Sequence, residues 1–215
     1  MDDPFDLLGS GNLEGLRAVL AANPALTRTR HASGASLLAW AHYAGKPEAA
    51  PVICEHIEAL DPYDAIIADD IGAVYAALDG GWNGNDLSPD GFTPLGLAAF
   101  FNRPAIFSLL LQLTKDVNRR AENAQQVAAL HAAVARRNAG MVEALLRADA
   151  DPNLTQADGF TPLHVAAAHG DTAIVAMLLL FGADPKVENA KRESAIEYAR
   201  SRGHEWLAQR LEGSH

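Results

Sequence analysis

The chain has 215 residues, of which 49% are apolar and 20% are charged, and its formal net charge at pH 7 is −10. These proportions are typical of folded domains, so the chain is not a mostly disordered protein. The acidic excess repels nucleic acids and anionic membranes, which argues against both as partners.

The cellular compartment is indicated by three features of the sequence. Cys54 is the only cysteine, so no disulfide can form within the chain and nothing indicates an oxidising environment. The first residues, MDDPFDLL, lack the basic and apolar regions of a secretory signal. No apolar run is long enough to span a bilayer. We therefore expect a cytoplasmic protein.

The negative charge is concentrated in the first half. Residues 1–118 contain 15 acidic and 6 basic side chains, a net charge of −9. No Lys or Arg occurs between Lys46 and Arg103, an interval that contains ten acidic residues. This field could attract a basic partner, or it could serve only to keep an elongated protein soluble.

The first half also contains a degenerate duplication. The segment Asp3–Leu8 (DPFDLL) resembles Asp61–Ile66 (DPYDAI). At nearly the same offset, Gly45–Pro47 (GKP) resembles Asn102–Pro104 (NRP). This pattern indicates a block of two structural repeats that occurs twice.

A clearer repeat begins near residue 90. Asp90–Phe101 (DGFTPLGLAAFF) closely matches Asp158–His169 (DGFTPLHVAAAH), and weaker copies occupy Ala128–Arg137 and Ser194–Gly203. The apolar anchors of these copies are Leu95, Leu130, Leu163 and Ile196. They recur with a nearly fixed period of about 33 residues, which indicates stacked supersecondary units.

The best copy predicts two helices and the turns around them. Gly159 permits a tight turn, Thr161 can cap the first helix, and Pro162 fits the first helical position. An apolar stripe at helical spacing follows between residues 174 and 179, and Gly182 can end that second helix in the left-handed conformation.

The segment Thr161–Ala166 (TPLHVA) matches the signature T-P-L-H-x-A, and the chain resembles the ankyrin-repeat family. The resemblance implies an all-α solenoid of stacked helix–turn–helix units with short β-hairpin fingers. It covers nearly the whole chain and is similar to stand-alone bacterial ankyrin proteins. We expect a single domain, 1–215, of six to seven repeats including caps. The repeats are expected to start near residues 3, 33, 61, 89, 122, 156 and 189.

Three departures from this pattern predict local irregularities. Two full repeats need about 66 residues, whereas the N-terminal copies are offset by roughly 58 residues, so each block lacks about nine. This shortfall falls near Leu60–Asp61 and leaves no room for a hairpin finger. Thr114 and Asp149 replace the glycine that ends a helix, and the left-handed region suits Thr poorly. The stretch Asn118–Gln126 is two residues longer than its counterpart and is expected to bulge.

We find no sequence signature of catalysis, a cofactor or a metal. Nucleotide-binding, zinc-protease and serine-hydrolase motifs are absent. The segment Asn83–Gly91 fails as a calcium loop because Leu87 stands where a ligand is needed. Cys54 and His56 would point apart on a helix. The resemblance implies that His131 and His164 make structural hydrogen bonds between repeats. No enzyme, metal or cofactor is expected.

The resemblance implies that a partner contacts the finger tips and the exposed ends of the first helices, which line a concave groove. Phe100 and Phe101 are the strongest candidates, although a shortened finger could let both rings pack inside. Phe92 and Phe160 could pack against the next finger, and His169 could be merely solvated. The candidate partner-binding residues are Tyr43, Asp90, Phe92, Phe100, Phe101, Gln125, Val127, Arg136, Asp158, Phe160 and His169.

The functional hypothesis is a protein–protein interaction module that acts as a scaffold, adaptor or inhibitor. Its partner would be a protein with a basic and apolar surface. The first alternative is a self-associating structural protein that dimerises through an exposed Phe patch, although a monomer is preferred. An enzyme with an unrecognised site is a remote second alternative.

Overall fold

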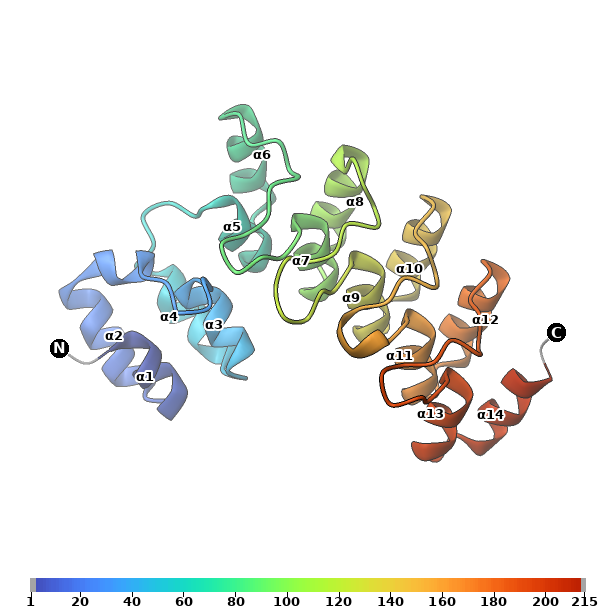
Figure 1. Cartoon of the computed structure of the whole chain (residues 1–215). Helices are drawn as coiled ribbons and strands as arrows, with labels where there is room; N and C mark the ends of the chain where they lie inside the picture. The colour runs from blue at the N-terminus through green and yellow to red at the C-terminus, as the bar shows by residue number, and fades with distance from the viewer. Residues whose placement is uncertain (1–2, 214–215) are drawn as a thin grey trace. The chain divides into compact units, whose positions relative to one another are not determined.

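The computed structural model describes residues 3–213, which form fourteen α-helices in seven consecutive pairs (Figure 1). We call the first helix of each pair the A helix and the second the B helix. The helices belong to two compact units, unit 1 (Met1–Gly91) and unit 2 (Phe92–His215). The all-helical repeat architecture predicted from the sequence is confirmed.

Unit 1 contains three helix pairs and two short 3-10 helices, Pro24–Arg28 and Pro47–Ala49. Its α-helices are α1 (Pro4–Ser10), α2 (Leu13–Ala22), α3 (Leu37–Tyr43), α4 (Ala50–Cys54), α5 (Pro62–Ala68) and α6 (Ile71–Asp79).

Unit 2 contains four helix pairs and one 3-10 turn, Ala157–Gly159. Its α-helices are α7 (Pro94–Phe100), α8 (Pro104–Leu113), α9 (Ala129–Ala135), α10 (Ala139–Arg147), α11 (Pro162–Ala168), α12 (Thr172–Leu180), α13 (Ala195–Ser201) and α14 (Glu205–Glu212).

Every A helix has seven residues, and a polar side chain caps six of the seven N-termini. Thr161, for example, accepts a hydrogen bond from the backbone N–H of His164, and Pro162 follows it as predicted. Asp3 and Asp61 cap α1 and α5 in the same way. Capping therefore fixes where the first helix begins in six of the seven repeats.

The spacing of the A helices is regular except at one step. These helices begin at Pro4, Leu37, Pro62, Pro94, Ala129, Pro162 and Ala195. The short step lies between α3 and α5, where α4 has only five residues and residues 55–61 run directly into α5. No finger precedes α5, in agreement with the shortfall seen in the sequence.

The fingers are tight turns rather than extended hairpins. Among residues 3–213, β-pairing is limited to the isolated bridges Arg30↔Ser36 and Glu188↔Ser194. One backbone hydrogen bond closes each of four fingers, from residue 31 to 35, 121 to 127, 156 to 160 and 189 to 193. The second of these loops is two residues longer than the other three, which confirms the predicted insertion.

The two replaced helix-end glycines behave differently. Asp149 adopts the left-handed conformation with φ of 63°. Thr114 instead leaves the helix in an extended conformation, with φ of −68° and ψ of 134°. A β-branched residue avoids the left-handed region, so the end of α8 is altered as expected.

The core of unit 2 lies between two rows of helices (Figure 1). Helices α7, α9, α11 and α13 stack in one row, and α8, α10 and α12 form the second. The repeated leucines Leu95, Leu130 and Leu163 are at most 4% exposed. Paired alanines such as Ala166 and Ala167 are fully buried, and their small size lets neighbouring A helices approach closely.

Candidate functional site

Two buried histidines join successive repeats in unit 2. The Nε2 atom of His131 lies 3.3 Å from the carbonyl oxygen of Phe160, and that of His164 lies 3.0 Å from the carbonyl oxygen of Glu193. Burial lowers the pKa of His131 to about 4 and also lowers that of His164. Both rings are therefore neutral near pH 7 and have the structural role that the sequence implied.

Two asparagines form a second link between repeats. Asn118 donates to the carbonyl oxygen of Asp149 at 3.2 Å and accepts from the backbone N–H of Asp151 at 2.7 Å. One repeat later, Asn153 makes the same pair of bonds to Gly182, at 2.8 Å, and to Asp184, at 2.7 Å. Sequence reasoning missed both asparagines, although the recurring D-x-N pattern could have revealed them.

Neighbouring finger tips in unit 2 are also hydrogen-bonded. The backbone N–H of Ala157 donates to the carbonyl oxygen of Gln125 at 3.0 Å. The backbone N–H of Ala190 donates to the backbone carbonyl oxygen of Asp158 at 2.8 Å. The side chains of Gln125 and Asp158 are exposed, and Val127 is half-buried. These predicted binding residues therefore stand on a row of fingers held at fixed spacing.

The phenylalanine pair at the end of α7 is split between solvent and core. Phe100 is 40% exposed, whereas Phe101 is only 9% exposed, and their rings meet edge to face at 5.2 Å. Successive side chains diverge by about 100° around a helix, and here the second ring turns toward the core. The prediction that Phe101 is an exposed contact residue is therefore wrong, and the prediction for Phe100 remains open.

The guanidinium of Arg136 lies 5.7 Å from the centroid of the Phe100 ring, in the next repeat. Arg136 immediately follows α9, and His169 occupies the same position after α11. Both side chains are exposed. The structure thus places three predicted residues, Phe100, Arg136 and His169, on successive A-helix ends of unit 2.

Two further predicted residues are partly covered. Phe160 is half-buried between the rings of His164 and Tyr198, at centroid distances of 5.6 and 5.3 Å. Phe92 is also half-buried. Phe160 therefore packs against its own A helix and that of the next repeat, which is close to the alternative of packing against the next finger.

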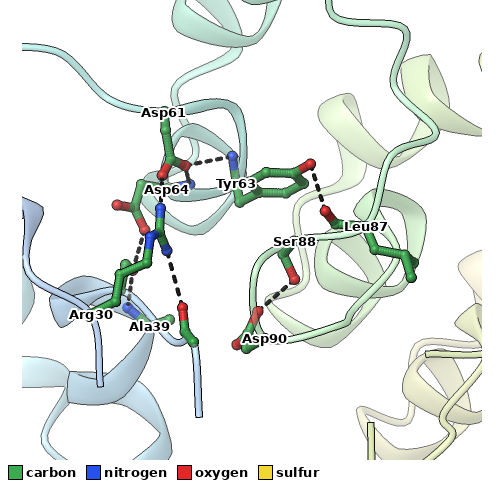
Figure 2. Close-up of polar contacts among 10 residues, drawn as sticks. Arg30, Ala39, Asp61, Tyr63, Asp64, Leu87, Ser88 and Asp90 are labelled. Atoms are coloured by element: carbon green, nitrogen blue, oxygen red, sulfur yellow. Dashed lines mark hydrogen bonds and ion pairs between the residues drawn. The ribbon is translucent and has the colours of Figure 1, made fainter. Parts of the chain in front are cut away.

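Unit 1 brings Tyr43 and Asp90 together. The Tyr43 hydroxyl donates to Asp90 Oδ2 at 3.0 Å, and the Ser88 hydroxyl donates to Asp90 Oδ1 at 2.5 Å. Burial and the charge of Asp90 raise the pKa of Tyr43, so the hydroxyl stays protonated and remains a donor. The Tyr63 hydroxyl donates to the carbonyl oxygen of Leu87 at 2.9 Å (Figure 2).

A buried carboxyl group stands where unit 2 has its histidines. Asp64 is the third residue of α5, as His164 is of α11, and it accepts a 2.5 Å hydrogen bond from Ser36. Burial, followed by the charge of Asp61, raises the pKa of Asp64 to about 7. Sequence reasoning missed Asp64, although its register in the DPYDAI segment matches the motif histidine.

The same region contains an ion pair and a small polar cavity. Arg30 pairs with Asp61 at 2.6 Å (Figure 2). The cavity has a volume of about 180 Å³. It is lined by residues 27–30 at the end of the first 3-10 helix, by Ser36, by linker residues between 57 and 61, and by Asp64. The second and third repeats are therefore joined by side-chain contacts, the Ser36–Asp64 hydrogen bond and the Arg30–Asp61 ion pair, where a third finger is missing.

The finger of the second repeat approaches the loop around Pro89, which precedes the fourth helix pair. A Cβ atom on Gly34 would lie 2.2 Å from the carbonyl oxygen of Pro89, and Gly34 has φ of +90°. Only glycine fits this approach and this conformation together. The missing finger thus lets the second finger meet the last loop of unit 1 directly.

The net charge resides entirely in unit 1. Residues 1–91 carry 14 acidic and 4 basic side chains, a net charge of −10, whereas residues 92–215 carry 13 of each sign. No described cluster of three or more His, Cys, Asp or Glu side chains could hold a metal ion. None of the helices within residues 3–213 has the length and apolar character needed to cross a bilayer.

Stacked helix pairs joined through fingers define the class of helical repeat proteins. The family model for ankyrin repeats, three copies long, matches residues 64–156 and 130–213, which is more than half of the chain. The chain belongs to the ankyrin-repeat family. No curated protein matches it. Ankyrin repeats are generally protein–protein interaction modules, and a protein partner is implied for this chain.

Proposed function

We propose that this protein binds a partner protein through the A-helix ends and finger tips of unit 2, with Phe100 as the central contact. The observation that carries the proposal is the exposed Phe100 ring beneath Arg136. Aromatic and arginine side chains are the residues that most often dominate binding energy at interfaces. The hydrogen-bonded fingers form a preorganised surface, which lowers the entropic cost of association.

The role that fits this arrangement is that of a scaffold, adaptor or inhibitor, with residues 1–215 acting as one domain. Unit 1 would add a negatively charged surface, because its net charge is −10. A partner region that contacts unit 1 would then be basic, and its association rate would fall as salt increases. Tyr43 and Asp90 are the candidate contacts in unit 1.

The test is affinity capture from a lysate of the source organism. The wild type is compared with Phe100→Ala and with Leu180→Ala, which removes an 82% exposed side chain from the B helix α12. Truncation of a central contact weakens binding by about tenfold or more. We expect Phe100→Ala to lose the captured protein and Leu180→Ala to retain it, with both variants folded like the wild type.

Two outcomes would overturn the proposal. Equal capture by wild type and Phe100→Ala would mean that binding occurs elsewhere on the chain. If no protein is captured and the wild type is a dimer that Phe100→Ala converts to a monomer, the Phe100 surface serves self-association. Molar mass measured by light scattering over a concentration series separates this second outcome.

A further inference from the structure

Three basic side chains recur at one position along unit 2. Arg136, His169 and Arg202 each immediately follow an A helix, and each lies one full repeat after the previous member. All three are exposed. We call these three residues the basic column. Because its members are spaced by one repeat, they occupy equivalent positions directly after α9, α11 and α13.

The basic column differs from five other arginines of unit 2. Five arginines there form ion pairs with carboxylates, and they are Arg119, Arg137, Arg147, Arg192 and Arg200. Within residues 3–213, no ion pair forms to Arg136, His169 or Arg202. The positive charge of the two column arginines is therefore not neutralised by a carboxylate of unit 2.

Aromatic rings hold the two arginines in place. Arg136 lies over Phe100 at 5.7 Å, and Arg202 lies over Tyr198 at 5.2 Å. Arg202 also donates to the Tyr198 hydroxyl at 3.0 Å. These contacts restrict the side chains but leave the guanidinium charge available, which lowers the entropic cost of binding an anion.

The residues beside the column are small. Ala135, Ala168 and Ser201 end the three A helices directly before the basic residues. Small side chains at these positions leave space for the backbone of a bound segment. A polyproline II segment advances about 9 Å in three residues, which is close to the roughly 8–10 Å between packed helices.

We propose that the basic column binds an extended acidic segment of a partner protein, with a carboxylate at every third position. This inference rests on the proposed function, because it assigns the chemistry of the partner at that same surface. Guanidinium groups bind carboxylates through paired hydrogen bonds, so Arg136 and Arg202 would be the outer anchors. Residues 92–215 carry 13 acidic and 13 basic side chains, so unit 2 lacks the excess of positive charge that is typical of nucleic-acid binding, whereas a short acidic segment needs only the local charge of the column.

The test uses a fluorescent peptide of five Glu-Pro-Pro triplets with the full-length chain in about 0.15 M salt, where charges more than about 8 Å apart are screened. Wild type is compared with the double variant Arg136→Gln/Arg202→Gln. The matched control is Arg147→Gln/Arg192→Gln, which removes the same charge from two exposed, ion-paired arginines. We expect the column variant to weaken binding about five- to thirtyfold, and the control to leave it within about twofold.

Four results would overturn the inference. The first is no measurable binding of the Glu-Pro-Pro peptide to wild type. The second is equal weakening by the two double variants, which would show a response to net charge alone. The third is tighter binding of a Lys-Pro-Pro peptide or of single-stranded oligothymidylate. If the captured partner is lost in Phe100→Ala but kept in Arg136→Gln/Arg202→Gln, the proposed function stands and this inference fails.

Discussion

The two units connect their repeats by different chemistry. In unit 2, neutral groups make the recurring connections: His131 and His164 reach carbonyl oxygens of the following finger, and Asn118 and Asn153 bond to backbone groups one repeat ahead. One ion pair, Arg137–Asp171, is added to them. In unit 1, ionisable side chains make them, through the Ser36–Asp64 and Tyr43–Asp90 hydrogen bonds and the Arg30–Asp61 ion pair.

The missing third finger explains this difference. A finger supplies backbone carbonyl groups that a histidine of the preceding repeat can reach. Since no finger precedes α5, no third-finger carbonyl group is available to the second repeat, which has Ala39 at the histidine position. The junction is made instead by Asp64 of the third repeat, which bonds back to Ser36 of the second. The fold therefore tolerates the loss of a standard connection when side chains satisfy the buried polar groups. The consequence is that unit 1 becomes sensitive to protonation in a different way from unit 2.

The largest expected effect tests the close approach of the second finger to the last loop of unit 1. Gly34 and Gly182 have nearly equal φ angles of +90° and +91°, but only Gly34 faces a backbone atom, the carbonyl oxygen of Pro89. We expect Gly182→Ala to cost about 1–2 kcal/mol for its conformation alone. Gly34→Ala should cost about 2–5 kcal/mol, because the steric clash adds to that strain. Urea unfolding of both variants measures the difference, and equal costs would refute the close approach.

The next effect is a response to pH with opposite sign in the two units. In unit 2, the native pKa of His131 is about 4 and its ordinary value is 6.5, so the unfolded state binds the proton first and unit 2 loses stability as pH falls below 6.5. In unit 1, the native pKa of Asp64 is about 7 and its ordinary value is 3.8, so the native state binds the proton first and unit 1 gains stability as pH falls below 7.

Between pH 7 and pH 5, each change should amount to about 2 kcal/mol. Amide hydrogen exchange read by mass spectrometry, corrected for the intrinsic effect of pH, reports each unit separately. His131→Gln should reduce the loss in unit 2, leaving the part that His164 contributes, and Asp64→Asn should abolish the gain in unit 1. A change in stability of the same sign in both units would contradict the proposal that the two units respond to pH in opposite ways.

A smaller effect tests the asparagine connection of unit 2. Asn153→Ala removes one hydrogen bond to Gly182 and one to Asp184. We expect a cost of about 1–2 kcal/mol, because two neutral hydrogen bonds are lost at an exposed site. Faster exchange of the Asp184 amide should accompany the lower unfolding midpoint. Protection of that amide at the wild-type level would show that Asn153 does not hold the next repeat.

The smallest effect concerns the Tyr63 hydroxyl of unit 1. Tyr63→Phe removes its hydrogen bond to Leu87 and should cost about 1 kcal/mol. Tyr75 provides the control because it is 50% exposed on α6. Tyr75→Phe should leave the unfolding midpoint unchanged. A comparable loss in both variants would mean that the Tyr63 bond adds nothing specific.

The sequence predicted the regular part of the fold best. The TPLH signature placed Thr161 as a cap and His164 as a bridging residue, because both roles depend on local spacing. The short offset between the DPFDLL and DPYDAI segments correctly indicated a shortened connection before α5. The burial of Phe101 was not predictable from family position alone, because it depends on how that ring packs. Asp64 was overlooked because an acidic side chain at a core position contradicts the usual preference for solvent.

The Gly34–Pro89 approach also constrains how such a chain can change in length. In unit 2, the two middle repeats offer their neighbours the same histidine at the same spacing, so duplication of one of them would recreate its junction. In unit 1, the second finger touches the loop that follows the third helix pair, so insertion of a single repeat between them would separate contacting partners. A change in the length of unit 1 therefore has to preserve this contact between Gly34 and Pro89.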